Sequence, residues 1–486
     1  MIVLFTVLVY FAALLLLSRL VAGRGGNDVF FMAGRKSPWM LVAFGMVGAS
    51  ISGVSFIGVP GWVMTTDMTY LQMCLGFIAG YAVVAYVLLP LYYRLGLPSI
   101  YGYLLQRYGT VSYKTGATFF IINKVVGAAA KFYIVCRLLK ECLSPAVDVP
   151  YVVVVAFTLL LIWFYTRKGG MKTLVWTDAF QTMCLLVALM LLLVKVVEML
   201  GVDWKEAMSM VADDSMSRIF VFDDIMSKQY FWKQFVSGVF VVIVMTGLDQ
   251  DMMQKNLTCK DLKSAQKDMC SYGVLFVPVN LMLLSLGVLL VHLYGCLGVS
   301  LPVKGDELLA GLVLDGHMGT LCVVLFAIGV IASAFSSADS AMTSVTTSFC
   351  VDIMRKENDT KVRKMVHMSF LIVFVGVTLV FDAIGSGSII DTIYTLVAYA
   401  YGPLLGLYAF GMLTKRRVKE KAVPWVAVAA PLLCMAADWL AKTWLGYHFG
   451  YELLLFNGML TFVGLWCFSD GAICRAYGES DNDNML

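Results

Sequence analysis

The feature that most constrains this chain is a succession of long apolar runs separated by short polar segments. An α-helix that crosses a bilayer needs about 20 mostly apolar residues, and many of these runs reach that length. Charged residues make up only 14% of the chain and the mean hydropathy is +0.83, outside the range of soluble globular proteins. The sequence therefore predicts an all-α polytopic membrane protein.

Runs bounded by charged residues, Pro and Gly predict about thirteen transmembrane helices. The predicted spans are 1–22, 38–65, 70–93, 112–141, 149–166, 173–199, 232–254, 271–295, 317–350, 366–384, 388–413, 422–443 and 453–472. An odd number of spans places the two termini on opposite sides of the membrane. With the N-terminus outside, most of the 36 Lys and Arg residues, Lys255 among them, fall in cytoplasmic segments, as the positive-inside rule requires. We therefore expect a multi-pass protein of the plasma (inner) membrane with a cytoplasmic C-terminus.

The remaining composition argues against catalysis. The twelve Cys residues are scattered through apolar segments without a CxxC motif, and the four His residues lie far apart. These patterns predict neither a metal cluster nor a catalytic constellation, so we do not expect an enzyme. The net charge of +4 reflects topology and does not indicate nucleic-acid binding. A short amphipathic surface helix is expected in the outer segment 200–231, and residues 473–486 are expected to form a cytoplasmic tail.

The ninth predicted span contains "IASAFSSADSAMTS" at 331–344, which is unusually polar for a membrane helix. Asp339 borders a stripe of hydroxyls that follows one helical face, formed by Ser333, Ser336, Ser337, Ser340 and Ser344. Serines in membrane helices often permit close packing and bond back to the preceding turn, but packing does not explain the carboxylate. Several oxygen ligands beside one carboxylate suit a small hard cation.

The second predicted span, "MVGASISGVSFIGVPGWV" at 46–63, is interrupted by glycines, serines and Pro60. Gly and Pro loosen a helix, and backbone freed at membrane depth is tolerated where it lines a cavity or is buried in protein. Freed carbonyls can bind a cation while the N-terminus of a half-helix faces a substrate, as in secondary transporters. A kinked packing helix is the alternative for this segment taken alone.

Taken together, these segments resemble the sodium/solute symporter family, which includes bacterial proline, sugar and sialic acid carriers and animal sodium/glucose cotransporters. The resemblance covers nearly the whole chain. It rests on the ordered strings "DVFFMAGR", "SISGVSFIGVPG", "YGYLLQRYG", "GGMKTLVWTDAFQ", "GLDQDMMQK", "ASAFSSADSAMTSVTTSFCVDI" and "YGPLLGLYAFGML".

The resemblance implies a core of two inverted five-helix repeats whose first helix is broken. The repeats would occupy 38–199 and 232–413, after a leading transmembrane helix at 1–22 and before two additional helices at 422–472. Because each repeat has an odd number of spans, the two repeats would insert into the membrane with opposite topology. The predicted number of spans allows this arrangement.

The resemblance also implies cation sites. The family's shared sodium site uses backbone carbonyls of the broken span and of the ninth span together with two hydroxyls of the ninth span. The matching residues are Gly48, Ile51, Ser333, Ser336 and Ser337. Some relatives, the sialic acid carriers among them, have an additional sodium site. Asp178 matches its aspartate and Ser340 matches another of its ligands, while Asp339 stands where a hydroxyl is more usual, so these three residues form a candidate second cation site.

The implied function is sodium-coupled symport, in which the protein imports a small organic solute by alternating access with Na⁺ as the coupling ion. Lys124 and Lys131 lie on one face of the fourth span. Lys124 resembles the basic residue with which sialic acid carriers hold the substrate carboxylate, whereas Lys131 is expected to snorkel or to pair with a carboxylate. The other candidate substrate contacts are Ser52, Ser55, Asp249 and Gln250, although a loop-capping role is equally open for the last two. An organic anion such as a sialic acid or a monocarboxylate is the first expectation.

Other functions remain open at this point. The solute could instead be neutral, such as a sugar, a polyol or an amino acid like proline. A sensor that keeps the transporter fold is a further alternative, although such a protein normally carries an attached signalling domain. A channel would also use sites lined by oxygen atoms, but the motifs of the inverted repeats favour alternating access.

Overall fold

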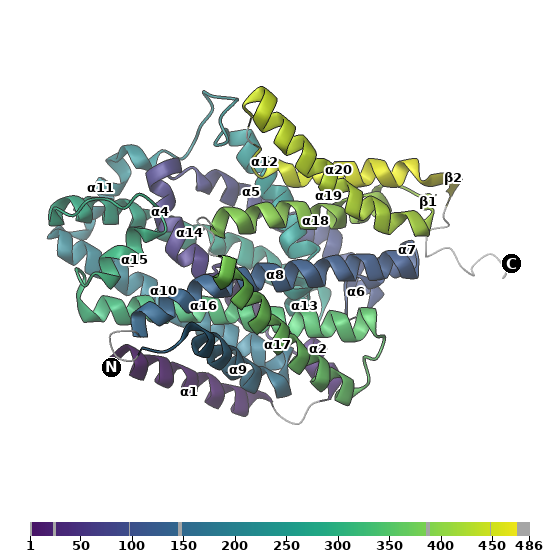
Figure 1. Ribbon diagram of the computed structural model, residues 1–486, viewed down its shortest axis with the longest axis horizontal. Helices are drawn as coiled ribbons and strands as arrows, with labels where there is room; N and C mark the ends of the chain where they lie inside the picture. The colour runs from purple at the N-terminus through teal and green to yellow at the C-terminus, as the bar shows by residue number, and fades with distance from the viewer. Residues whose placement is uncertain are drawn as a thin grey trace.

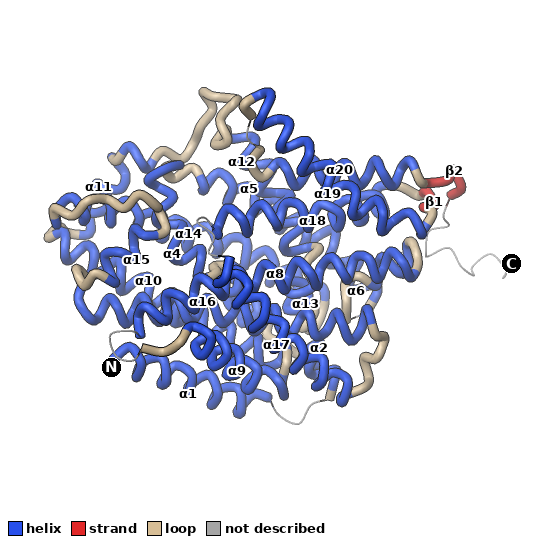
Figure 2. The backbone as a smooth tube through the Cα atoms, viewed as in Figure 1, coloured by secondary structure: helices blue, strands red, loops and turns tan. Residues whose placement is uncertain are grey.

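The computed structural model describes residues 2–22, 26–96, 98–143, 148–384, 389–447 and 449–473. They form a helical bundle in which the long helices run roughly along one axis, with short helices and a two-stranded sheet toward its ends (Figure 1, Figure 2). The first helix, α1 (Ile2–Ala22), begins near one end of the bundle, and the last strand, β2 (Ser469–Ile473), lies at the other (Figure 1). The observed class is therefore the predicted all-helical one.

The remaining helices are α2 (Asn27–Met32), α3 (Trp39–Ser50), α4 (Gly53–Thr66), α5 (Tyr70–Val83), α6 (Leu89–Leu95), α7 (Gly102–Arg107), α8 (Thr110–Leu143), α9 (Tyr151–Gly169), α10 (Met171–Leu200), α11 (Trp204–Asp213), α12 (Phe231–Val242), α13 (Gln250–Asn256), α14 (Leu262–Leu297), α15 (Glu307–Leu314), α16 (Gly319–Ser348), α17 (Thr360–Ile384), α18 (Ile389–Leu413), α19 (Val423–Leu440) and α20 (Glu452–Cys467). Strand β1 (Arg416–Val418) pairs with β2 in antiparallel fashion. The amphipathic helix expected in 200–231 is present as α11.

Among the described residues, eight helices are long and apolar enough to cross a membrane, and two bent pairs of helices reach that length together. The shorter apolar segments Phe5–Val21 and Glu452–Cys467 lie where the first and last spans are predicted. Each of the thirteen predicted spans coincides with one of these helices or with α18. Eight to ten candidate spans are thus observed, while the count of thirteen and the orientation in the membrane stay predictions.

Helix α16 forms the centre of the bundle. In its most apolar window 72% of the residues are buried, compared with 28% for α17, which lies at the periphery. Large apolar side chains remain exposed on the surface of α10, including Met183, Val187 and Met190. In a membrane bundle, such apolar residues face the acyl chains. The polar stripe of α16 lies on a buried helix instead and is packed inside the protein.

The first bent pair joins α3 and α4 at an angle of 62°. The break occurs at Ile51 and Ser52, where Ile51 leaves helical geometry with φ −82° and ψ 83°. Ser52 caps the new helix, because its Oγ accepts a hydrogen bond from the Ser55 amide at 3.3 Å. Pro60 lies inside α4 instead of at the break. A Cβ on Gly287 of α14 would overlap the Pro60 carbonyl oxygen, so this part of α4 serves close helix packing.

The second bent pair joins α12 and its π-helical end at Ile243–Gly247 to α13, with an angle of 72°. Asp249 caps α13 by accepting hydrogen bonds from the Asp251 and Met252 amides at 2.8 and 3.3 Å. Each bent pair lies at the start of one of the two predicted repeats. Two inverted repeats are expected to have breaks at equivalent positions, and the start of each repeat is such a position. The repeat boundaries themselves stay predictions.

Candidate functional site

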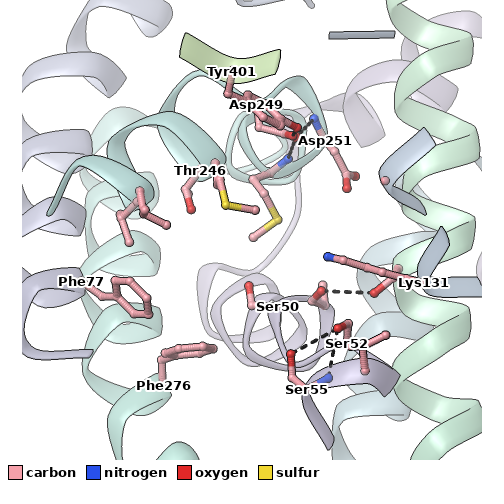
Figure 3. A pocket seen from close by; sticks show the side chains of 18 of the residues that line it. Ser50, Ser52, Ser55, Phe77, Lys131, Thr246, Asp249, Asp251, Phe276 and Tyr401 are labelled. Carbon is pink, nitrogen blue, oxygen red and sulfur yellow. Dashed lines mark hydrogen bonds between the residues drawn. The ribbon is translucent and has the colours of Figure 1, made fainter. Parts of the chain in front are cut away.

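A cavity of about 210 Å³ lies between the two bent pairs (Figure 3). The break between α3 and α4 forms one side, and α8, α12 and α14 form others. Phe77 and Phe276 provide an apolar wall, whereas Lys131, Ser50 and Asp249 bring polar groups to the same space (Figure 3). An apolar cavity with a few converging polar groups beside broken helices is typical of a solute site in a transporter.

The break frees backbone carbonyls at the predicted sodium site. The amide of Ser52 bonds to the Ser50 carbonyl at 3.1 Å, so the Gly48 carbonyl loses the donor that a continuous helix would supply. Ile51 has left helical geometry, and its carbonyl therefore turns away from the α3 axis. Gly48 itself is packed closely against Thr182 of α10, because a Cβ at this position would overlap the threonine side chain.

Helix α16 brings the predicted hydroxyl ligands to this break. Ser337 Oγ donates a hydrogen bond to the Ser333 carbonyl at 3.2 Å and contacts the Ala49 carbonyl at 3.5 Å. Ser333 Oγ bonds back to the Gly329 carbonyl at 2.9 Å, so the predicted ligand atom of this residue is its backbone oxygen, which accepts a hydrogen bond from the Ser337 hydroxyl. The structure thus places Ser337 against the end of α3, with carbonyls and hydroxyls close to one another.

Ser336 faces α10 instead. Its Oγ donates to Asp178 Oδ1 at 2.7 Å, and Asp178 Oδ2 lies 2.8 Å from Lys255 Nζ. All three side chains are buried, and Lys255 is only 1% exposed. Because Ser336 gives its hydrogen to Asp178, its oxygen lone pairs remain available to a cation. Lys255 was grouped with the basic residues of the cytoplasmic segments; the structure shows it buried in α13 inside the bundle, while the side of the membrane stays a prediction.

Asp339 lies near this ion pair, but with partners of its own. Its Oδ2 accepts a hydrogen bond from the Tyr165 hydroxyl at 2.6 Å. Within the described part of the chain, Asp339 Oδ1 and Ser340 Oγ are buried without a hydrogen-bond partner. The predicted residues of the second cation site are therefore neighbours, but Asp178 is already bound by an ammonium group.

Lys124 reaches the cavity as an ion-paired residue. Its Nζ lies 2.7 Å from Asp251 Oδ2 and 3.3 Å from Asp249 Oδ1. The Tyr401 hydroxyl donates a further hydrogen bond to Asp249 Oδ2 at 2.5 Å. Two carboxylates already neutralise Lys124, so its charge is not available to a solute anion as the sequence suggested.

Lys131 differs from Lys124 in its ion pairing. It lines the cavity near the α3 and α4 break, and none of the described carboxylates forms an ion pair with it (Figure 3). It lies seven positions after Lys124 on α8, so both side chains approach the cavity from one helix face. The expected pairing of Lys131 with a carboxylate is not observed in the described structure, and the lysine with the free charge is not the one predicted.

The other predicted contacts divide between two environments. Ser52 and Ser55 line the cavity, with their hydroxyls 3.2 Å apart at the start of α4. Gln250 instead binds the segment before α7, donating to the Pro98 carbonyl at 2.8 Å and accepting from the Ile100 amide at 2.9 Å. The loop-capping alternative therefore describes Gln250 better than a solute contact does.

Sequence reasoning missed the hydroxyl chain on the far side of the cavity. Tyr81 donates to Tyr272 Oη at 2.7 Å, and Tyr272 is hydrogen-bonded to Ser50 Oγ. All three line the cavity. No local pattern marks such tyrosines, because they lie on α5 and α14 and meet only through tertiary packing.

Comparison with known families gives a match to the model described as "Sodium:solute symporter family" over residues 30–424. Among similar proteins, the human sodium/iodide cotransporter is 26% identical over 421 residues, covering 80% of this chain and 62% of that protein. The chain thus spans less than two thirds of the length of that relative. The sodium/sialic acid symporter NanT of Aliivibrio fischeri is 23% identical over 414 residues, covering 82% of this chain and 79% of that protein. The human sodium-coupled monocarboxylate transporter 1 is 23% identical over 461 residues, covering 90% and 72%.

Solved structures show the same fold. A Na⁺-coupled sialic acid symporter in a substrate-bound outward-open state superposes with a TM-score of 0.81 at 19% identity, covering 96% of this chain and 97% of that one. Mhp1, a nucleobase-cation-symport-1 family transporter in a closed conformation, gives a TM-score of 0.53 at 15% identity, covering 89% and 92%. The family match extends over well more than half of the chain. The chain therefore belongs to the sodium:solute symporter family, which is a family of membrane transporters and not of enzymes.

Proposed function

We propose that this protein is a sodium-coupled secondary active symporter that imports a small organic anion, of the size of a sialic acid or a monocarboxylate, by alternating access. The observation that carries the proposal is the ammonium group of Lys131, which faces the cavity without a carboxylate partner among the described residues. Lys131 is half-buried, and a cation inside the bundle without a partner is unfavourable unless an anion joins it, so the cavity favours an anionic solute.

The sodium ion is proposed to bind where α16 meets the break. Its ligands would be the carbonyl oxygens of Gly48, Ile51 and Ser333 and the hydroxyl oxygens of Ser336 and Ser337. These are hard oxygen donors of the type that alkali and alkaline-earth cations prefer. Sodium would fasten the break to α16 and thereby hold the cavity in the form that binds solute, which is the differential stabilisation that coupling requires.

The anion is proposed to bind between Lys131 and the first turn of α4. Ser52 and Ser55 line this part of the cavity, and the positive end of the α4 dipole points toward it. Lys124 would act differently, by holding Asp249 and Asp251 at the start of α13. We propose transport toward the cytoplasm. This direction is given relative to the predicted orientation, in which the N-terminus lies outside the plasma membrane.

A neutral solute is the second candidate, and one observation favours it. The hydroxyl groups of Tyr81, Tyr272 and Ser50 also line the cavity, and such groups can bind the hydroxyls of a sugar or a polyol. In this case Lys131 would bind a hydroxyl or carbonyl oxygen of the solute.

A ligand panel separates the two candidates. We would measure the melting temperature of the purified protein with sialic acids, monocarboxylates, sugars, polyols and amino acids, in sodium and in potassium buffers. An anion is expected to raise the melting temperature in sodium only, with the effect lost in Lys131→Met and retained in part in Lys131→Arg. Stabilisation by a neutral solute that persists in Lys131→Met would overturn the anion assignment while leaving sodium coupling in place.

A further inference from the structure

The ammonium group of Lys255 is buried beside the predicted sodium site. Lys255 belongs to α13, the half-helix after the second break, and its Nζ lies 2.8 Å from Asp178 Oδ2 of α10. The lysine and the aspartate are each 1% exposed. A charge this deep must be paired, because an uncompensated ion inside a protein costs several kcal/mol or more. The pair therefore fixes the end of the Lys255 side chain at Asp178.

Both oxygens of the Asp178 carboxylate are engaged. Oδ2 holds Lys255, and Oδ1 accepts the hydrogen of Ser336 at 2.7 Å. Ser336 is at the same time a proposed ligand of the first sodium ion. A second sodium ion at Asp178 would have to displace the ammonium group or lie directly beside it, and like charges repel strongly where little water screens them.

The charges around this pair leave room for one sodium ion. Asp339 and Asp251 both lie within electrostatic reach of Asp178 and Lys255; Asp339 accepts a hydrogen bond from Tyr165, and Asp251 is ion-paired with Lys124. With Asp251 balanced by Lys124 and Asp339 counted as ionised, Asp178, Asp339 and Lys255 carry one net negative charge. A single sodium ion at the first site, which contacts this cluster through Ser336, brings the total to zero, whereas a second ion would leave an unbalanced positive charge in the interior.

We propose that Lys255 takes the place of a second cation at Asp178, so that the carrier binds one sodium ion and not two. The inference rests on the proposed sodium coupling and adds its stoichiometry. Lys255 would determine the number of ions without contacting the solute or the sodium ion. The cluster would also connect α13 with α16 through Asp178 and Ser336. Binding of the ion would therefore affect the positions of both bent pairs.

Removal of the ammonium group should create the missing site. In Lys255→Met, Asp178 and Asp339 would carry two uncompensated negative charges close to two free buried oxygens, Asp339 Oδ1 and Ser340 Oγ. A second sodium ion then restores neutrality. In the double variant Lys255→Met/Asp178→Asn, one negative charge remains and a single sodium ion again balances it.

The test is the number of ²²Na⁺ ions that saturate the purified, full-length protein at pH 8 with no solute present. We expect one ion per chain for the wild type and for Lys255→Arg, two for Lys255→Met, and one for the double variant. Two ions bound to the wild type would overturn the inference and leave sodium coupling intact, as would a Lys255→Met protein that still binds one. No ion bound to the folded wild type would contradict the proposed function itself.

The inference can still be tested if one of the variants fails to fold. Size-exclusion chromatography and tryptophan fluorescence report folding of each protein before its ions are counted. If Lys255→Met aggregates, the wild type and the double variant Lys255→Met/Asp178→Asn decide the question. The inference expects one ion in both, whereas a sodium ion bound at Asp178 would make the count fall from two to one.

Discussion

At the scale of residues, two of the three described lysines inside the bundle near the cavity are paired with carboxylates. Lys124 is held by Asp249 and Asp251, and Lys255 is held by Asp178. Lys131 differs from these, because no described carboxylate pairs with it. The first two lysines stabilise helix positions, whereas Lys131 is available to a solute.

The hydroxyl of Ser337 should contribute directly to sodium affinity. Ser337→Ala removes one proposed ligand and leaves the fold intact, since its hydrogen bonds at 3.2 and 3.5 Å are weak. We expect the sodium concentration for half-maximal thermal stabilisation to rise about tenfold, equivalent to about 1.4 kcal/mol. Ser369→Ala on the exposed face of α17 is the matched control and should leave it unchanged. Equal sodium affinities in the two variants would remove Ser337 from the site.

Lys124 should matter for stability more than for solute binding. Lys124→Met leaves Asp249 and Asp251 without their cation, and breaking a buried pair in this way costs about 3–5 kcal/mol. We expect a clearly lower melting temperature, measured by tryptophan fluorescence in detergent, and recovery in the Lys124→Arg protein. A Lys124→Met protein as stable as the wild type, but unable to bind solute, would restore Lys124 as the solute anchor.

The serine stripe and the aspartates could be identified from the sequence because polar residues are rare inside membrane helices. The residues that pair with them could not be identified from the sequence. Lys255 is the first of a run of basic residues that the sequence assigns to a cytoplasmic segment, and its burial depends on the 72° bend between α12 and α13. Lys124 and Lys131 share one helix face, so periodicity could not show which of them would meet Asp249 and Asp251.

At the scale of elements, the two bent pairs determine where the site lies. Glycines, serines and Pro60 in 46–63 predicted an interrupted helix, and the break is present at Ile51 and Ser52, whereas Pro60 lies inside α4. A proline in a helix can be accommodated when its neighbours pack well, and the sequence does not contain that packing information. Pro60 lies opposite Gly287, where α14 and α4 are in close contact.

The contact between α4 and α14 should tolerate no added methyl group. In Gly287→Ala, the new Cβ would overlap the Pro60 backbone oxygen, which cannot rotate away. Overpacking of this kind costs about 1–3 kcal/mol, so the melting temperature should fall. Gly376→Ala on α17 is the control, because nothing lies within 4 Å of its Cβ position. A Gly287→Ala protein as stable as this control would show that α14 and α4 can separate without cost.

At the scale of the whole molecule, the fold is that of a solved sodium-coupled sialic acid symporter. The helical class and the approximate positions of the spans follow from hydropathy alone, since long apolar segments must form helices in lipid. How the spans pack around α16 does not follow from hydropathy. In the proposed mechanism, sodium bound between the break and α16 favours one arrangement of the bundle, and the solute then binds to an already organised cavity.

The measurement that tests this account most directly is accumulation of the solute identified in the ligand panel by proteoliposomes, driven by an inward sodium gradient with the voltage held at zero. The account predicts accumulation above the external concentration with the sodium gradient, none with an equal potassium gradient, and loss of accumulation in Ser336→Ala and Ser337→Ala. Equal uptake in sodium and potassium, unaffected by both substitutions, would contradict sodium coupling at the break.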